Sequence, residues 1–243
     1  MDRAPEGGAW GADAEAGRAA SALGLWIALT IALEAATWGV GARTADLARA
    51  VESGVVRIER DGAAAPSDEA VRKAVSLQRD SLPFWAALRM AADFLFEPAA
   101  LALRAASAAV GFTALAALAG RGWRFGRAWS DGVRLQGWWV LGLAVRLGLM
   151  AWLRRGEADV DTSAALLLPP GTYPAAAVLA LRGLDAFAAA GWLATALAAR
   201  RRGDANLAVA LALCGVLATF EAAVRAAAAL LAGSAMRLAL AAP

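Results

Sequence analysis

The chain has 243 residues, 60% of them hydrophobic, and its mean hydropathy is +0.53. This apolar content exceeds the roughly 45–50% that is usual in globular proteins, and it indicates a membrane protein. The net charge of +3 is the difference between 24 basic residues, which are 23 arginines and one lysine, and 21 acidic residues. The chain also has 70 alanines. GC-rich coding produces such a bias, so the charge does not indicate a nucleic-acid partner.

The residue types that most enzymes and metal sites need are scarce. The chain has no histidine, which excludes imidazole-based zinc sites and Ser-His or Cys-His nucleophiles. The only lysine, Lys73, lies in no phosphate-binding loop motif. The only cysteine, Cys214, cannot form an internal disulfide and is interpreted as a small packing residue. We therefore expect no catalytic residue, no cofactor and no metal.

Five segments are long and apolar enough to cross a membrane as α-helices. About 20 mostly apolar residues are needed, because a helix rises about 1.5 Å per residue through about 30 Å of hydrocarbon. The five segments cover residues 19–40, 98–120, 135–153, 175–199 and 207–232. They predict an all-α, polytopic membrane protein, a bundle of five transmembrane helices between a tail over 1–18 and a tail over 233–243.

The 41–97 loop between the first two predicted spans is the only sizeable region expected outside the membrane. It carries eight basic and nine acidic residues. The alternation of apolar and charged residues over 55–60, just before an Asp-Gly pair, predicts a short strand and a turn. Pro66 predicts the start of a small amphipathic helix that continues to about Arg79.

The end of this loop, Leu82–Glu97, is expected to be one interfacial helix, lying along the membrane surface. Its charges, Arg89, Asp93 and Glu97, recur every four residues and form a single polar stripe, which we expect to face water. The alternative is a soluble helix packed on the helix before it. Pro98 is expected to break any helix that runs straight on from this segment.

The distribution of arginines predicts the orientation in the membrane. The short segments on the amino-terminal side hold nine arginines, and the short segments on the opposite side hold three. The nine are Arg3, Arg18, Arg121, Arg124, Arg127, Arg134, Arg200, Arg201 and Arg202. Positively charged short loops stay in the cytoplasm, so we expect a multi-pass protein of the inner (plasma) membrane with a cytoplasmic amino terminus.

Seven charged residues lie inside the predicted spans, and six of them are candidates for a charge cluster: Glu34, Arg146, Arg182, Asp185, Glu221 and Arg225. Each costs about 2.5–3.5 kcal/mol at a helix centre, so these side chains must pair or face a polar cavity. Spacings of three and four residues predict the pairs Arg182–Asp185 and Glu221–Arg225. Glu34 and Arg146 have no partner on their own helices, which predicts a contact between the first and third helices.

The charges on the fourth and fifth predicted helices are expected to form one buried cluster. About seven residues join the two helices, which should therefore be antiparallel neighbours. Asp185 and Glu221 each lie about 15 residues from that turn, at equal depth in the membrane. Such a cluster either fixes which helices pack together or lines a pathway for an ion or solute, and the sequence leaves both open.

Four short segments resemble sequences of prokaryotic Yip1-domain membrane proteins. They are the glycine and arginine loop at Gly120–Arg127, the segment 162–169, the Leu-Asp-Ala-Phe string at 184–187 and the basic turn at Arg200–Arg202. In that family such segments lie before the third helix, before the fourth helix, at its start and after its end. The resemblance covers about residues 98–232.

The resemblance implies a Yip1-like four-helix membrane core over 98–232, a cytoplasmic amino terminus and no enzymatic activity. It implies a scaffold or a membrane-organising, trafficking-type partner. The expected partners are the lipid bilayer and a membrane protein or a second copy of the chain, with no nucleic acid. One alternative is a small transporter or channel subunit that uses the charged residues inside the membrane. Another is a membrane enzyme with a central carboxylate.

Overall fold

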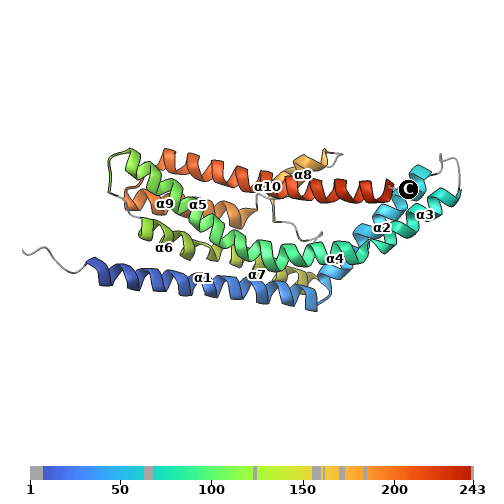
Figure 1. The fold of residues 1–243 in the computed structure, drawn as a ribbon, viewed down its shortest axis with the longest axis horizontal. Helices are drawn as coiled ribbons and strands as arrows, with labels where there is room; N and C mark the ends of the chain where they lie inside the picture. The colour runs from blue at the N-terminus through green and yellow to red at the C-terminus, as the bar shows by residue number, and fades with distance from the viewer. Residues whose placement is uncertain are drawn as a thin grey trace, which may run out of the picture.

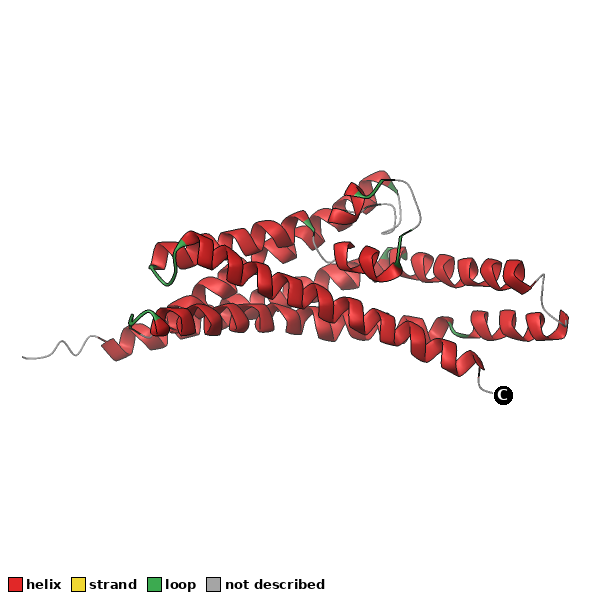
Figure 2. Cartoon of the chain, turned by 90° about the horizontal axis from the view of Figure 1, so that it is seen from above, coloured by secondary structure: helices red, strands yellow, loops and turns green. Residues whose placement is uncertain are grey.

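Helices make up nearly all of the structure (Figures 1 and 2). The computed structural model describes residues 8–62, 68–122, 125–154, 160, 162–169, 173–182 and 185–241. Across these ranges there is no β-strand, and the only strand-like feature is an isolated bridge between Ser163 and Asp185. The all-α class that the apolar segments predict is therefore confirmed.

Short connections join the helices along the chain. The first half holds α1 (Gly8–Gly39), α2 (Ala42–Gly62), α3 (Asp68–Asp80), α4 (Leu82–Ala91), the π-helix η1 (Ala92–Phe96) and α5 (Glu97–Leu118). The second half holds α6 (Phe125–Leu135), α7 (Gly137–Leu153), the 3-10 helix η3 (Ala164–Leu167), α8 (Ala175–Arg182), α9 (Ala186–Arg202) and α10 (Leu207–Ala241). In Figure 1, α1 and α10 lie along opposite edges, with α5, α6, α7 and α9 between them.

Three stretches of helix in the described part of the chain are long and apolar enough to cross a membrane. They are Gly17–Gly39 in α1, the continuous helical stretch Asp68–Leu118, and Leu207–Ala232 in α10. These stretches cover the first, second and fifth predicted spans to within one or two residues of their ends, and they support a membrane protein. The third predicted span corresponds to α7, whose 17 residues extend about 25 Å. A turn at Gln136 separates α7 from α6, which lies before it in the chain.

The prediction of one continuous helix over 175–199 is wrong. The segment is divided into α8, which ends at Arg182, and α9, which begins at Ala186. Asp185 has an extended backbone, and its carboxylate accepts a hydrogen bond of 2.6 Å from the backbone N–H of Ala188. A side-chain oxygen in this position caps the amino terminus of a helix. Asp185 therefore begins a helix instead of lying inside one.

The expected break at Pro98 is also wrong, because a π-turn accommodates the proline. The helix runs without interruption from α4 through η1 into α5. The backbone N–H of Glu97 bonds to the carbonyl of Ala92, five residues back instead of four. A proline ring normally clashes with the carbonyl four residues before it. The wider π-turn displaces that carbonyl, so the helix continues.

The polar stripe of Leu82–Glu97 faces the bundle, so its expected orientation toward water is wrong. Asp93 is only 2% exposed, whereas the neighbouring Leu95 and Phe96 are 66% and 67% exposed. Asp93 and Glu97 have partners on other helices, Arg89 pairs with Asp93, and the apolar side of this helix forms the outer surface. An apolar outer surface is what contact with lipid requires.

The segment 55–60, expected to be a strand, lies within the helix α2. Val51 and Val55 are four residues apart on one helix face, and both are buried. Their burial on one face is consistent with a helix instead of a strand. The predicted amphipathic helix is confirmed as α3, while Pro66 lies outside the described residues. Figure 1 shows α2 and α3 side by side at one end of the bundle, near the end of α10.

Small residues build most of the bundle core. One buried cluster comprises Ala108, Phe112, Trp192, Ala196, Ala199, Ala210 and Cys214. Cys214 thus has the packing role expected of it. Small residues allow close packing between helices. At Gly191 the ring of Trp139 packs so closely that an added Cβ would lie 2.5 Å from it.

The start of α1, the α5–α6 connection and the α9–α10 turn lie at the same end of the bundle (Figure 1). This grouping agrees with assigning these segments to one side, while Arg3 and Arg124 lie outside the described residues. Arg121, Arg127, Arg200 and Arg201 are all exposed at this end. The α2–α3 pair and the end of α10 lie at the opposite end.

Adding a methyl group at Gly191 is expected to destabilise the protein. Gly191→Ala should lower the free energy of unfolding in detergent by about 1–3 kcal/mol, the usual effect of overpacking, because the methyl meets the Trp139 ring. Gly215→Ala is the matched control, since nothing lies within 4 Å of a Cβ there. Alanine favours a helix over glycine, so the control should be neutral or stabilising. Thermal melts followed by circular dichroism check this, and equal losses in both variants contradict it.

Candidate functional site

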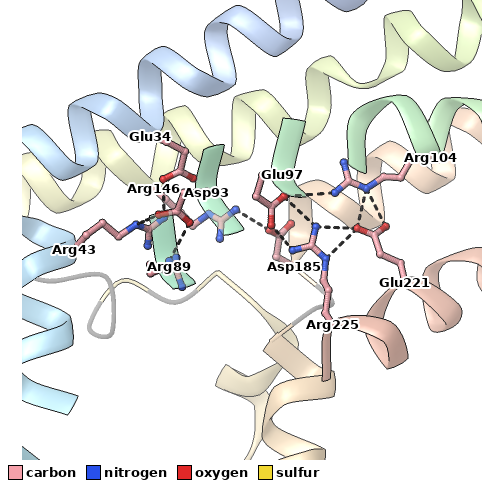
Figure 3. Close-up of polar contacts among 10 residues, drawn as sticks. All are labelled: Glu34, Arg43, Arg89, Asp93, Glu97, Arg104, Arg146, Asp185, Glu221 and Arg225. Carbon is pink, nitrogen blue, oxygen red and sulfur yellow. Dashed lines mark hydrogen bonds and ion pairs between the residues drawn. The ribbon is translucent and has the colours of Figure 1, made fainter. Parts of the chain in front are cut away.

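Ten charged side chains lie along the bundle and form three neighbouring sets of ion pairs, which together we call the charge network (Figure 3). Five are carboxylates and five are arginines, so their formal charges cancel. They are Glu34 of α1, Arg43 of α2, Arg89 of α4, Asp93 of η1, Glu97 and Arg104 of α5, Arg146 of α7, Asp185 before α9, and Glu221 and Arg225 of α10. Charges withdrawn from water need such compensation.

Arg43 is the centre of the first group of charges. Its Nη2 lies 2.9 Å from Oε2 of Glu34, and its Nε lies 3.1 Å from Oδ2 of Asp93. All three side chains are buried. Asp93 also pairs with Nε of Arg89 at 2.9 Å and accepts a hydrogen bond of 3.0 Å from the indole N–H of Trp38. An arginine from the start of α2 thus links α1 to η1.

Glu97, Arg104, Glu221 and Arg225 form a second group between α5 and α10. Nε of Arg104 donates to both carboxylate oxygens of Glu221, at 2.8 and 2.9 Å, and its Nη2 lies 3.8 Å from Glu97. Arg225 donates to Glu221 through Nε at 3.1 Å and Nη2 at 3.0 Å. It also donates to Glu97 through Nη1 and, at 3.0 Å, through Nη2. Each arginine contacts both carboxylates, so the group fixes the register of α5 against α10.

The ring of Trp139 lies against the guanidinium of Arg104. Its central carbon lies 4.9 Å from the ring centroid of Trp139, which packs edge-on against Trp192 with centroids 5.6 Å apart. Arg104 is 5% exposed, and its Nη1 has no hydrogen-bond partner among the described residues. The negative face of an indole attracts a cation. This contact offsets part of the cost of burying the guanidinium.

Asp185 and Arg146 connect the broken helix to the rest of the bundle. Oδ2 of Asp185 lies 3.5 Å from Nη2 of Arg146 on α7. The backbone of Asp185 forms a bridge with Ser163, and the N–H of Ala186 donates to the carbonyl of Thr162 at 3.2 Å. Non-helical backbone at membrane depth must be covered by protein or line a wet cavity. The segment before η3 provides such cover at the start of α9.

Glu221 and Arg225 form the pair that their spacing predicts. The predicted cluster of the fourth and fifth helices, however, is wrong in its membership. The side chains that complete the cluster around Glu221 and Arg225 are Glu97 and Arg104 of α5. They occupy the place that was predicted for charges of the fourth helix.

The predicted contact between Glu34 and Arg146 is replaced by two other pairs. Glu34 pairs with Arg43, and Arg146 pairs with Asp185, although α1 and α7 do pack against each other. Arg182 is exposed at the end of α8. Arg182 and Asp185 do not share one helix, because α8 ends at Arg182, and their predicted pairing stays a prediction.

Sequence reasoning missed four members of the network, Arg43, Arg89, Asp93 and Glu97, and gave no role to Arg104. The signal for Arg104 was present, since it lies inside the predicted span 98–120 and carries the same insertion cost as the other charges. Asp93 and Glu97 were assigned to a stripe that faces water. Arg43 lies at the start of a helix, and its sequence position does not distinguish it from any other loop arginine.

The network holds helices together and offers no metal site. Among the residues that the structure describes, no group of three or more His, Cys, Asp or Glu side chains could hold a metal ion. No protein-family model, curated protein or solved structure matches the chain. The charge network and the outer surface of the bundle are therefore the features from which a function can be inferred.

Removing the arginine at the centre of the first group is expected to be strongly destabilising. Arg43→Gln leaves the buried carboxylate of Glu34 without its cation, which should cost about 3–5 kcal/mol. Adding Glu34→Gln should recover part of the loss. Arg79→Gln is the matched control, because Arg79 pairs with Glu52 at the same 2.9 Å but both side chains are more than half exposed. Unfolding in detergent measures the effect, and similar losses for Arg43→Gln and Arg79→Gln contradict it.

Proposed function

We propose that the chain is a Yip1-like, non-enzymatic integral membrane protein that acts as a scaffold or membrane-organising partner. The observation that supports this most is the charge balance of the network, in which carboxylates and arginines of different helices pair directly. Paired charges inside a membrane fix which helices pack together and in which register. With its charges turned inward, the bundle has its outer faces available for other molecules.

Two apolar stripes on the outer surface suit contact with lipid and with a membrane partner. Phe96, at the end of η1, and Leu103 and Val110 of α5 recur every seven residues and are each more than half exposed. On α10, Val216 and Phe220 are four residues apart and equally exposed. These spacings keep the side chains on one helix face. Each stripe can accept an apolar helix of another membrane protein or of a second copy.

We further propose a position in a bacterial inner (plasma) membrane with a cytoplasmic amino terminus. The support is the nine-to-three distribution of arginines among the short segments. The grouping of several of these arginines at one end of the bundle is consistent with it. The resemblance to Yip1-domain proteins implies the same orientation.

Cysteine labelling tests this orientation. Arg201 and Ser76 are exposed residues at opposite ends of the bundle, and each is replaced by cysteine in a Cys214→Ala background. An impermeant maleimide added to intact cells should label the cysteine at 76, and should label the one at 201 only after the cells are opened. The reverse pattern would show that the amino terminus faces outward.

A small transporter or channel subunit is the second candidate, and the break before α9 favours it. In many transporters, discontinuous helices place their free ends and charged side chains around an ion or substrate. Asp185 stands at such a break, opposite Arg146. The 17 residues of α9 extend about 25 Å, so this break lies far from the α9–α10 turn.

Crosslinking and flux measurements separate the two candidates. A photo-crosslinking amino acid at exposed Phe220 should capture one membrane protein or a second copy reproducibly in cells. The same group at buried Cys214, on the same helix, should not. A purified scaffold reconstituted in liposomes should give no flux of protons, Na⁺, K⁺ or chloride above protein-free liposomes.

A transport function would be shown by flux that depends on Glu221. Gradient-driven flux that Glu221→Gln abolishes would contradict the scaffold and establish a transport pathway through the network. Glu52→Gln is the matched control, since Glu52 lies on the exposed surface of α2, outside the network. Flux lost equally in both variants would indicate damaged protein instead of a pathway, and thermal melts of both would reveal that damage.

A further inference from the structure

A hollow of about 320 Å³ opens between α6 and α9, at the end of the bundle that holds the α9–α10 turn. Its lining consists of Asp131, Arg134, Leu135, Ala198, Arg201 and Arg202. Three arginines and one aspartate give this lining an excess of two positive charges. The apolar stretch of α10 begins at Leu207, five residues after α9 ends. The hollow therefore lies near the level at which lipid headgroups meet the protein.

Arg202 is already held by two carboxylates. Its Nη1 lies 2.6 Å from Oδ2 of Asp131 on α6, and its Nε lies 2.6 Å from Oδ2 of Asp204 in the α9–α10 turn. These contacts compensate the charge of Arg202 and tie α9 to α6. They also occupy Asp131, the only acidic residue in the lining, so it does not neutralise the other two arginines.

Arg134 and Arg201 keep their charges available. They come from different helices, both are exposed, and neither has an ion pair or hydrogen bond within the described part of the chain. The rest of the lining, Leu135 and Ala198, is apolar. Guanidinium groups bind phosphate oxygens through pairs of N–H donors. Two free guanidinium groups beside an apolar surface match a phosphate ester that carries hydrocarbon.

The surface that continues from these arginines is apolar. On α7, Trp138 and Leu141 follow Arg134 by four and seven residues and are 38% and 46% exposed. On α9, Leu193 lies eight residues before Arg201 and is 49% exposed. The spacing within α9 places Leu193 on the helix side of Arg201, and Trp138 and Leu141 lie in the first turns of α7, just beyond the turn at Gln136 that follows Arg134. Tryptophan suits the headgroup level, and leucines suit acyl chains.

We propose that this hollow binds the headgroup of an anionic phospholipid. The phosphate lies between Arg134 and Arg201, and the acyl chains extend past Trp138 and Leu141 toward the hydrocarbon. Basic pockets between membrane helices recognise acidic lipids in this way. The ammonium group of a zwitterionic lipid is repelled by the two arginines, so the site selects phosphatidylglycerol over phosphatidylcholine. A scaffold and a transporter could both use this site, so the inference does not rest on the proposed function.

Native mass spectrometry of the purified full-length chain tests the site. The protein in detergent receives equal amounts of phosphatidylglycerol and phosphatidylcholine, and the retained lipids are counted. The unmodified chain should retain phosphatidylglycerol preferentially. Arg134→Gln combined with Arg201→Gln should weaken this binding about tenfold or more. Ala198→Trp, which fills the hollow without changing the charge, should also abolish the preference.

A matched control variant and competition with inorganic phosphate complete the test. Arg127→Gln combined with Arg200→Gln removes the same charge from α6 and α9 at exposed positions outside the hollow, and it should keep the preference. If it loses the preference as fully as the test variant, the attraction is a general one and the proposal is wrong. Retained binding in Ala198→Trp would also overturn it, as would displacement of the lipid by millimolar inorganic phosphate, which indicates a site for soluble anions. Circular dichroism establishes that each variant is helical.

Discussion

A charge that leaves water must be compensated, and this requirement decides how the helices of this chain come together. Arg43 joins Glu34 of α1 to Asp93 of η1, and Arg225 joins Glu97 to α10. Each arginine contacts carboxylates from more than one segment. A displaced helix would therefore separate several charges at once, and the penalty opposes every register except the observed one.

This role of the charges follows from the composition of the core. Alanine and glycine let helices approach closely, but a surface of small, similar side chains offers little to distinguish one register from the next. In the buried cluster of α5, α9 and α10, four of the seven members are alanine. Bulk is supplied at few points, such as Trp139 between Arg104 and Gly191. Close packing brings the helices together, and the ion pairs and these aromatic contacts select their alignment.

The sequence predicts what depends on composition and local spacing. It predicts the helical class, the membrane character, the start and end of α3 within a few residues, and the Glu221–Arg225 pair. It does not predict partners that only the folded arrangement brings together, such as Arg104 and Glu221, which are 117 residues apart. The break before α9 has a local signal, since Asp185 is a favourable capping residue inside an apolar run. The uniform hydrophobicity of residues 175–199 instead predicts one continuous membrane-spanning helix.

The π-turn over Ala92–Phe96 allows one long helix to serve two separate sets of partners. Asp93 and Glu97 are four residues apart and would share a face in a regular α-helix. Instead Asp93 reaches Arg43, and Glu97 reaches Arg225 at the other group of charges. The π-turn holds one more residue than an α-helical turn would, and it lies between the two groups of charges. A regular α-helix over the same residues would rotate all that follows by about 100° relative to the observed arrangement. The winding of these five residues therefore sets which face of α5 meets α10.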